Sequence, residues 1–410
     1  MDQPNSLPPA LTDRIPQEIY DSVIAAIGND NQRMRTMGAI SAVCHAWEAS
    51  SRSYIFYSFS FTPTSLTFLA REAGNRVLMS IRCAKYEVKR DTNKLPEDFL
   101  QEVLPRMPNL HSLVFAGCEP KMIIPVARIL SETGGRIMAL DITGDMFRQV
   151  WSSFRTFQEM VALFPYLRTL SLADICWEGE VGGSHEGGNT RVELPSTLRS
   201  VNIWRVLRTP SLLLWLSPAA ETIRSLQLFA LRRSNLHLVP LFTHLQHLSL
   251  LFLTTPKPGD LAHTLSSCTM LKTLKVFTEI VLPCGEALEK PSVDSMTTTS
   301  PNNQLRQAPW YAELLSSVSS PLSKLSLQVN HRPSRKVDPM GWKILSDLFR
   351  SSPFYAELKQ LEFNVALYDE LWDSRSDCER SIRRELVGLH PGTDLSVGAT
   401  TWPSPGFVSH

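Results

Sequence analysis

Cysteine is scarce in this chain, and the few cysteines lie far apart. The seven stand at positions 44, 83, 118, 176, 268, 284 and 378 of 410 residues, with no CxxC pair among them. A disulfide scaffold is dense in cysteine, and a structural zinc site needs closely spaced ligand pairs. The sequence supports neither, so we expect reduced thiols and no bound metal.

A charge excess and a long apolar run are also missing. The chain has 41 basic and 40 acidic residues, a formal net charge of +1. Such a chain has no overall field that draws it to nucleic acid or anionic lipid, so neither is an expected partner. The longest apolar run, near Ser211–Pro218, is too short to span a membrane. The first residues lack the basic and apolar regions of a signal peptide, which predicts a location in the cytoplasm or nucleus.

The short motifs of common enzymes are absent as well. The sequence contains no GxSxG, HExxH or GxxxxGK[ST] segment and no glycine-rich turn of the dinucleotide-binding kind. Its ten histidines are scattered along the chain. We therefore expect no catalytic function and no cofactor. The alternative is that the chain is an enzyme, and turnover in a broad activity screen would support that alternative.

The chain does contain enough apolar residues for an ordered fold. Hydrophobic residues make up 43% of it and charged residues 20%, which excludes wholesale disorder. A length of 410 residues exceeds what one core usually holds, so either several domains or an elongated repeat array is expected.

One spacing recurs along the chain: an apolar residue, two residues, an apolar residue, one residue, and a third apolar residue. We call this pattern the leucine sextet, as in LRTLSL, and most neighbouring copies begin between 22 and 32 residues apart. Alternation at the end of each sextet is a strand signal, and the period leaves room for a helix and two connections. The clear copies begin at Leu110, Ile137, Leu167, Leu198, Ile223, Leu245, Leu271, Leu322 and Leu358, and weaker copies begin at Phe56 and Leu78.

This pattern resembles the leucine-rich repeat, in which each unit buries its leucines only against neighbouring units. The regular repeat has Asn or Cys three residues after the last apolar position, and only Cys118 and Asn330 match it here. The resemblance implies an irregular α/β solenoid with a parallel sheet on its concave face. An ordinary α/β domain, in which the sextet is merely a common strand pattern, is the alternative.

The first sixty residues predict two or three short helices. Ile15, Ile19, Val23 and Ile27 follow one another at four-residue steps, and a second helix is expected over residues 32–48. Adjacent residues on a helix point about 100° apart, so Cys44 and His45 are not expected to form a nucleophile and its base.

These helices resemble an F-box, on motifs that occur in the expected order. The family's opening Leu/Ile-Pro-x-Glu-Ile segment and its later Val-Cys-x-x-Trp segment are both present, and His45 stands where the family often has Arg. With the repeats that follow, the chain looks like the F-box and leucine-rich-repeat proteins that are abundant in fungi. The resemblance implies that the helices bind a Skp-type adaptor within a cullin-RING ubiquitin ligase. The adaptor-binding residues carried over are Ile15, Pro16, Glu18, Ile19, Val23, Val43, Cys44 and Trp47.

The predicted organisation therefore has an F-box-like helical domain at residues 13–60 and a leucine-rich-repeat-like solenoid at residues 61–390. Residues 1–12 and 391–410 are predicted to be a disordered N-terminus and a loose C-terminal tail, and a helix at 371–386 could cap the stack. Flexible insertions are predicted at residues 179–191, which are rich in glycine, and 285–309, which are rich in Ser, Thr, Pro and Asn.

The two resemblances together imply a non-catalytic substrate receptor that links a protein target to a ubiquitin ligase. Two alternatives stay open. The chain could be a leucine-rich-repeat scaffold with no ligase attached, or the N-terminal helices could serve only to seal the first strand of the stack.

The sextets also predict where a target would bind. The residue directly after each last apolar position faces away from the leucines, and it is large and apolar in four successive repeats. Exposed apolar patches of this kind tend to be binding sites. The alternative is that these four side chains simply pack under a loop. Loop cations at Arg232, Arg233, Arg332, Arg335 and Lys336 could recognise an acidic or phosphorylated motif. The predicted target-binding residues are Trp204, Phe229, Leu251 and Phe277.

Overall fold

The computed structural model describes most of the repeat region and isolated residues before it. The described residues are 19, 22, 36, 39, 51, 55–61, 77–87, 97–144, 150–178, 192–231, 233–252, 261, 263–278, 307–331, 339–367, 379, 380, 382–384, 386, 389 and 392–400. They belong to two compact units, residues 1–197 and residues 198–410.

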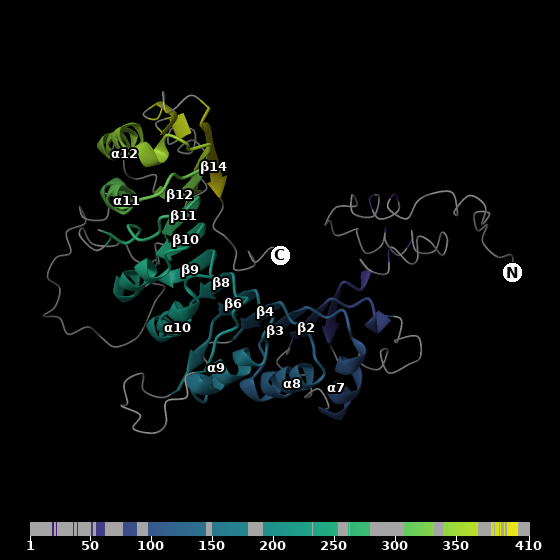
Figure 1. Cartoon of the computed structure of the whole chain (residues 1–410). Coiled ribbons are helices and arrows are strands. Elements are labelled where there is room, and N and C mark those ends of the chain that lie inside the picture. Colours follow the sequence, from purple (N-terminus) through teal and green to yellow (C-terminus); the bar gives the residue numbers. More distant parts are fainter. Residues whose placement is uncertain are drawn as a thin grey trace, which may run out of the picture. The chain divides into compact units, whose positions relative to one another are not determined.

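The first unit contains a parallel sheet whose strands follow the chain order, with one small exception. Its five strands are β1 (Ser58–Phe61), β2 (Cys83–Glu87), β3 (Ser112–Ala116), β4 (Ala139–Thr143) and β6 (Thr169–Ala173), in the order β1-β2-β3-β4-β6. The missing numbers belong to a separate two-stranded sheet of β5 (Val150–Trp151) and β7 (Cys176–Trp177). Helices α7 (Glu97–Val103), α8 (Pro120–Glu132) and α9 (Phe154–Ala162) lie along one side of the main sheet (Figure 1).

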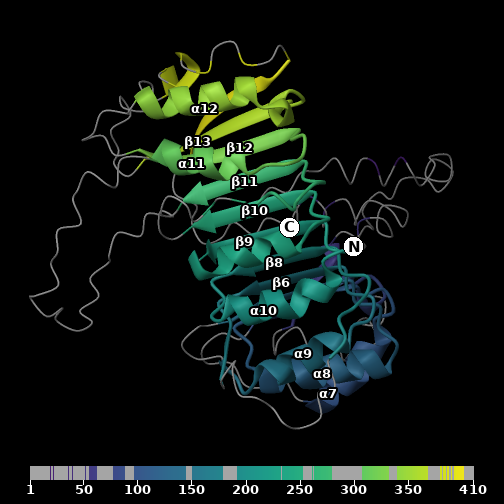
Figure 2. The ribbon, with the colours of Figure 1, turned by 60° about the vertical axis from the view of Figure 1, so that its left-hand side comes forward.

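The second unit repeats the same arrangement with longer strands. Its sheet contains β8 (Ser200–Trp204), β9 (Ser225–Leu231), β10 (His247–Phe252), β11 (Thr273–Thr278), β12 (Lys324–His331), β13 (Gln360–Leu367) and β14 (Asp394–Thr400), all parallel and in chain order. Helices α10 (Thr209–Leu216), α11 (Gln307–Ser316) and α12 (Pro339–Ser351) lie on one face of this sheet (Figures 1 and 2). The parallel sheet with helices on one face confirms the predicted α/β solenoid-like architecture.

The leucine sextets explain why the strands form where they do. In all nine clear copies the three apolar residues are at most 4% exposed, and the last two lie inside a strand. Strand residues alternate between buried and half-buried, because successive side chains point to opposite faces of a sheet. Each strand therefore buries its sextet toward the helices and leaves its other side chains on the opposite face.

Of the two weak copies of the leucine sextet, the structure confirms one and shifts the other. The copy at Phe56 is confirmed, because Phe59 and Phe61 pair with Ala84 and Tyr86 of β2. The copy at Leu78 is wrong by three residues, since Ala84 and Tyr86 occupy the places of the two strand leucines and the sextet begins at Ile81. Stacked rings replace leucine here, with centroids 4.8 Å apart for Phe61 and Tyr86.

The predicted loose tail also needs correction, because it contains strand β14. Leu361 and Phe363 of β13 pair with Leu395 and Val397 of β14. The corresponding first apolar position of the sextet is Gly392, whose φ of 101° favours glycine. The helix predicted before this strand is described only in part, at residues 379, 380 and 382–384. The sheet of the second unit thus extends beyond residue 390.

The other predicted segments lie largely outside the described residues. None of residues 179–191 is described, and of residues 285–309 only 307–309 are, as the first turn of α11. Near the N-terminus, Ile19, Ser22, Thr36 and Ala39 are helical and exposed. Within the part of the chain that the structure describes, no helix is long and apolar enough to cross a membrane.

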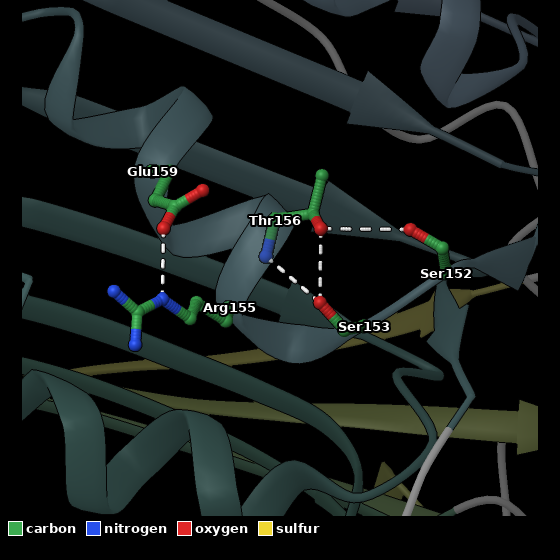
Figure 3. Close-up of polar contacts among 5 residues, drawn as sticks. All are labelled: Ser152, Ser153, Arg155, Thr156 and Glu159. Carbon is green, nitrogen blue, oxygen red and sulfur yellow. Dashed lines mark hydrogen bonds and ion pairs between the residues drawn. The ribbon is translucent and has the colours of Figure 1, made fainter. Parts of the chain in front are cut away.

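Helix α9 shows how local sequence fixes an element boundary (Figure 3). The Ser153 hydroxyl accepts a hydrogen bond of 3.1 Å from the backbone N–H of Thr156, which satisfies a donor of the first helical turn. On the exposed side, Arg155 Nε donates to Glu159 Oε1 at 2.8 Å, one helical turn away. Phe157, Met160 and Val161 are buried, and the ring of Phe157 contacts that of Trp151 in β5, with centroids 5.3 Å apart.

Replacing Ser153 by Ala is expected to lower the free energy of unfolding by about 1 kcal/mol, because the N–H of Thr156 loses its partner. Urea unfolding of the full chain measures the change. Ser152→Ala is the matched control, since the exposed Ser152 hydroxyl lies 3.5 Å from Thr156 Oγ1, at the limit of a hydrogen bond. Equal destabilisation by both substitutions would show that Ser153 does not cap the helix.

Candidate functional site

The face of the second unit that lies opposite its helices carries the candidate site. Strands β8, β9, β10 and β11 are neighbours in the sheet, and each presents three outward side chains. The register places these side chains in rows that run across the strands. The rows differ in chemistry from one end of the strands to the other.

The row at the carboxyl ends of these strands is apolar, and we call it the apolar ridge. Trp204 pairs with Phe229, Phe229 with Leu251, and Leu251 with Phe277. All four side chains are half-buried. The rings of Trp204 and Phe229 contact each other, with centroids 4.6 Å apart and planes tilted by 36°. At about 4.8 Å between strands, the ridge is about 15 Å long.

The register thus brings together the four residues that the sequence predicts as a target-binding surface. Their packing against one another contributes to the stability of the sheet, since aromatic pairs add roughly 0.5–1.5 kcal/mol beyond the area they bury. Their partial exposure leaves apolar surface open to solvent along four successive strands. Their role in binding stays a prediction.

The middle rows are mostly polar. The central row of these four strands contains Asn202, Gln227, Ser249 and Lys275, and the first row contains Ser200, Ser225, His247 and Thr273. Ser249 is buried, but the hydroxyl and amide groups at the other positions can donate hydrogen bonds to a bound chain or accept hydrogen bonds from it.

A row of cations directly precedes strands β8, β9 and β11 in the chain, and we call it the basic row. It consists of Arg199, Arg224 and Lys272, which precede β8, β9 and β11, and Gln246 takes the equivalent place before β10. The backbones are joined in order, since the N–H groups of Arg224, Gln246 and Lys272 donate at 2.8–2.9 Å to the carbonyls of Arg199, Arg224 and Gln246. Arg199 and Lys272 are exposed, and Arg224 is half-buried. None of these residues is among the binding residues predicted from the sequence.

The signal for the basic row is nevertheless present in the sextets themselves. Arg or Lys follows the first apolar residue of five clear sextets, those that begin at Leu167, Leu198, Ile223, Leu271 and Leu358. The predicted loop cations lie outside the described residues, except Arg233, which begins a 3-10 helix at Arg233–Leu241 and whose side chain is not described.

Charge on this face is unevenly distributed among the strands. Neither strands β8–β11 nor the residue before each strand includes an Asp or Glu. On the next strands the charges are mixed, because Lys324 of β12 forms an ion pair of 2.7 Å with Glu362 of β13. In the turn before β9 there is one carboxylate, that of the exposed Glu221, whose backbone carbonyl accepts a hydrogen bond from Arg224. The excess of positive charge therefore occurs on the strands that carry the apolar ridge, mainly at their amino ends.

The predicted adaptor-binding surface is described at one residue only. Ile19 is helical and 53% exposed, an unusual state for an isoleucine. The other predicted positions, Ile15, Pro16, Glu18, Val23, Val43, Cys44 and Trp47, lie outside the described residues.

The described cysteines are packing residues. Cys118 and Cys268 are buried, and their thiols lie 3.4 Å and 3.7 Å from the carbonyls of Tyr86 and Phe242 in the preceding repeats. Burial raises the pKa of Cys268 to about 11. In the described part of the chain, no group of three His, Cys, Asp or Glu residues could hold a metal ion.

Cys268 is expected to react with iodoacetamide at least about tenfold more slowly than the half-buried Cys83 at pH 8, because the thiolate is the reactive form and burial disfavours it. Mass spectrometry of peptides from the native full chain, sampled over time, measures both rates. In denaturant the two rates should become similar. Equal rates in the native protein would contradict the burial of Cys268.

Two solved structures are remotely similar to this chain. No protein-family model matches the chain, and no curated protein matches it. A chain from the crystal structure of the Rad7 and Elc1 complex of yeast has a TM-score of 0.36 and 11% identity, covering 92% of this chain and 91% of that chain. A protein from Bacteroides fragilis has a TM-score of 0.32 and 9% identity, covering 84% and 75%. At these values, fold and function have to be argued from the residues of this chain.

Proposed function

We propose that the chain is the non-catalytic substrate receptor of a Skp–cullin–F-box type ubiquitin ligase. The N-terminal helices bind the Skp-type adaptor, and the face opposite the helices of the second unit holds a protein target. The observation that carries the proposal is the order of features along the chain. The two F-box-like segments, Ile15–Ile19 and Val43–Trp47, precede a stack of parallel strands built from leucine sextets.

The exposure of Ile19 supports this proposal over a purely structural role for the N-terminal helices. A helix that only seals the end of a stack buries its apolar residues against that stack. Ile19 instead leaves about half of its surface open, at 53%. Apolar side chains on a short helix that remain exposed are suited to packing against a partner protein.

The physical task of such a receptor is proximity. Binding the adaptor at one site and the target at another raises the effective concentration of target lysines near the activated ubiquitin. No group on the receptor takes part in the transfer reaction. A stack of paired strands suits this task, because each repeat is fixed by hydrogen bonds and apolar contacts to the repeat before it.

Affinity purification of the tagged full chain from fungal cells tests the proposal. The expected result is enrichment of the Skp-type adaptor and a cullin, together with loss of both when Ile19 is replaced by Asp. Retrieval of protein partners without adaptor or cullin would contradict the proposal and favour a scaffold that is not attached to a ligase.

A further inference from the structure

We infer that strands β8–β11 bind an acidic protein segment that carries large apolar side chains. Apolar side chains of the segment pack on the apolar ridge, and its carboxylates interact with the basic row and Lys275. This inference deepens the proposed function, because it names the chemistry of the target, and it rests on that function for the biological use of the site.

The cations of the basic row precede three of the four strands that carry the apolar ridge, and Gln246 precedes the fourth, β10. The ridge ends at β8 on one side and β11 on the other, and the basic row spans the same strands. Lys275, in the central row of β11, is exposed and adds a fourth cation between them. Beyond β11 the ridge position becomes Gln328 on β12 and Asn364 on β13, and carboxylates accompany the cations. On the side of β12, the apolar surface and the excess of positive charge therefore end at the same strand.

The two rows are complementary to a segment that combines acidic and apolar residues. A solvated sheet face needs no run of aromatic side chains, and half-buried aromatic residues are the side chains that dominate binding energy in protein interfaces. Cations at the amino ends of strands that contain no Asp or Glu attract an acidic partner and speed its association. An acidic segment without apolar side chains would leave the ridge exposed to water. A neutral apolar segment would gain nothing from the basic row.

The dimensions of the face restrict the spacing within the bound segment. The basic row and the apolar ridge are five residues apart along each strand, for example Arg199 and Trp204, which corresponds to about 16 Å. The long side chains of Arg and Lys can bring their charged groups closer to the apolar ridge than this backbone distance. An extended segment that runs along the strands therefore needs about four or five residues between an apolar anchor and a carboxylate.

The same geometry disfavours single-stranded nucleic acid as the ligand. Proteins that bind single strands combine aromatic side chains for base stacking with cations that follow the backbone along the same groove. Here three cations precede the strands, Lys275 lies in the central row, and Arg205 is the one cation among the residues directly after the ridge, so cations do not follow the aromatic side chains from strand to strand. Leu251 also interrupts the aromatic residues. A protein segment can place a carboxylate and an apolar side chain at this spacing, whereas a nucleotide chain carries a phosphate beside every base.

Peptide display on the immobilised full chain tests the inference. A library of random 16-residue peptides is expected to yield peptides rich in Asp and Glu that also carry two or more of Leu, Phe, Ile and Trp. The most enriched peptide is then synthesised with a fluorescent label, and its affinity is measured by anisotropy. Raising sodium chloride from about 50 to 500 mM should weaken binding by about tenfold, because the charge contacts are screened.

Two double variants separate the two rows. Trp204→Ala with Phe229→Ala is expected to weaken binding of this peptide by at least about 30-fold, and Arg199→Glu with Arg224→Glu by at least about tenfold. Display on the charge-reversed variant should select peptides poor in Asp and Glu. Lys359→Glu is the matched control, because Lys359 holds the equivalent place before β13 and should change the affinity less than about twofold. Circular dichroism and thermal melting verify that each variant folds.

The experiment can refute the acidic target segment without refuting the proposed ligase role, and the reverse. Selection of peptides without acidic residues, unchanged affinity in both folded double variants, or tighter binding of a labelled oligo-dT than of any peptide would overturn the inference. Adaptor binding by the same variants is measured in parallel. Retained adaptor binding with no acidic peptide refutes only the inference, and acidic peptide binding without any adaptor binding refutes only the ligase role.

Discussion

Replacing Ile19 by Asp is expected to weaken binding of a purified Skp-type adaptor by at least about a hundredfold. Ile19 is 53% exposed in the free chain, so adaptor binding would bury most of its side chain. Truncating a central interface residue costs about 2–4 kcal/mol, and introducing a carboxylate adds the cost of a buried, unpaired charge. Isothermal titration of the full-length variant with the adaptor measures the effect.

Ile344→Asp is the matched control for this experiment. Ile344 lies on α12 and is 45% exposed, so the control makes the same substitution at similar exposure in the repeat region. It is expected to leave adaptor affinity within about twofold. Trp47→Ala, in the second predicted segment, should weaken adaptor binding as Ile19→Asp does. Equal adaptor affinity for the wild type and both N-terminal variants would refute docking through these helices.

Replacing Leu248 by Ala is expected to lower the free energy of unfolding by about 3–4 kcal/mol. Leu248 is 1% exposed in β10, and its strand neighbours Leu226 and Leu274 are 0% exposed. Removal of its side chain leaves a cavity in the layer between sheet and helices, which costs both the lost apolar burial and the lost contacts. Urea unfolding followed by tryptophan fluorescence measures the change.

The control for the core substitution is Leu214→Ala. Leu214 lies on α10 and is 52% exposed, so the same truncation there should change the free energy of unfolding by less than about 0.5 kcal/mol. A large cost at Leu214 together with a small cost at Leu248 would contradict the assignment of the buried face. Because each repeat is stabilised by its neighbours, Leu248→Ala should also weaken peptide binding at the apolar ridge.

The strands of this protein are largely predictable from the sequence, because one spacing carries both the strand signal and the buried face. Leu167, Leu170 and Leu172 illustrate the logic, since a strand begins between the first two and the last two face the helices. Prediction fails where Ala, Tyr or Gly takes the place of a large aliphatic residue or Phe. The sextet that begins at Ile81 is not recognisable from the sequence because Ala84 and Tyr86 hold its two strand positions. The last sextet is not recognisable because Gly392 holds its first position.

The candidate site is predictable in part. Register follows from the sextets, so the sequence alone is enough to place Trp204, Phe229, Leu251 and Phe277 in one row, as the strand pairing confirms. The basic row is harder to predict, because a single Arg or Lys beside a leucine indicates only a solvated position. The basic row can be recognised as one surface only when the structure shows Arg199, Arg224 and Lys272 at the same end of nearby strands that contain no Asp or Glu.

Hydrogen–deuterium exchange of the full chain, with and without the purified Skp-type adaptor, tests the central claim most directly. The account predicts slower exchange on adaptor binding within residues 13–60, and unchanged exchange in strands β8–β11. Protection of those strands by the adaptor, or no change within residues 13–60 at adaptor concentrations that saturate a known receptor, would contradict it.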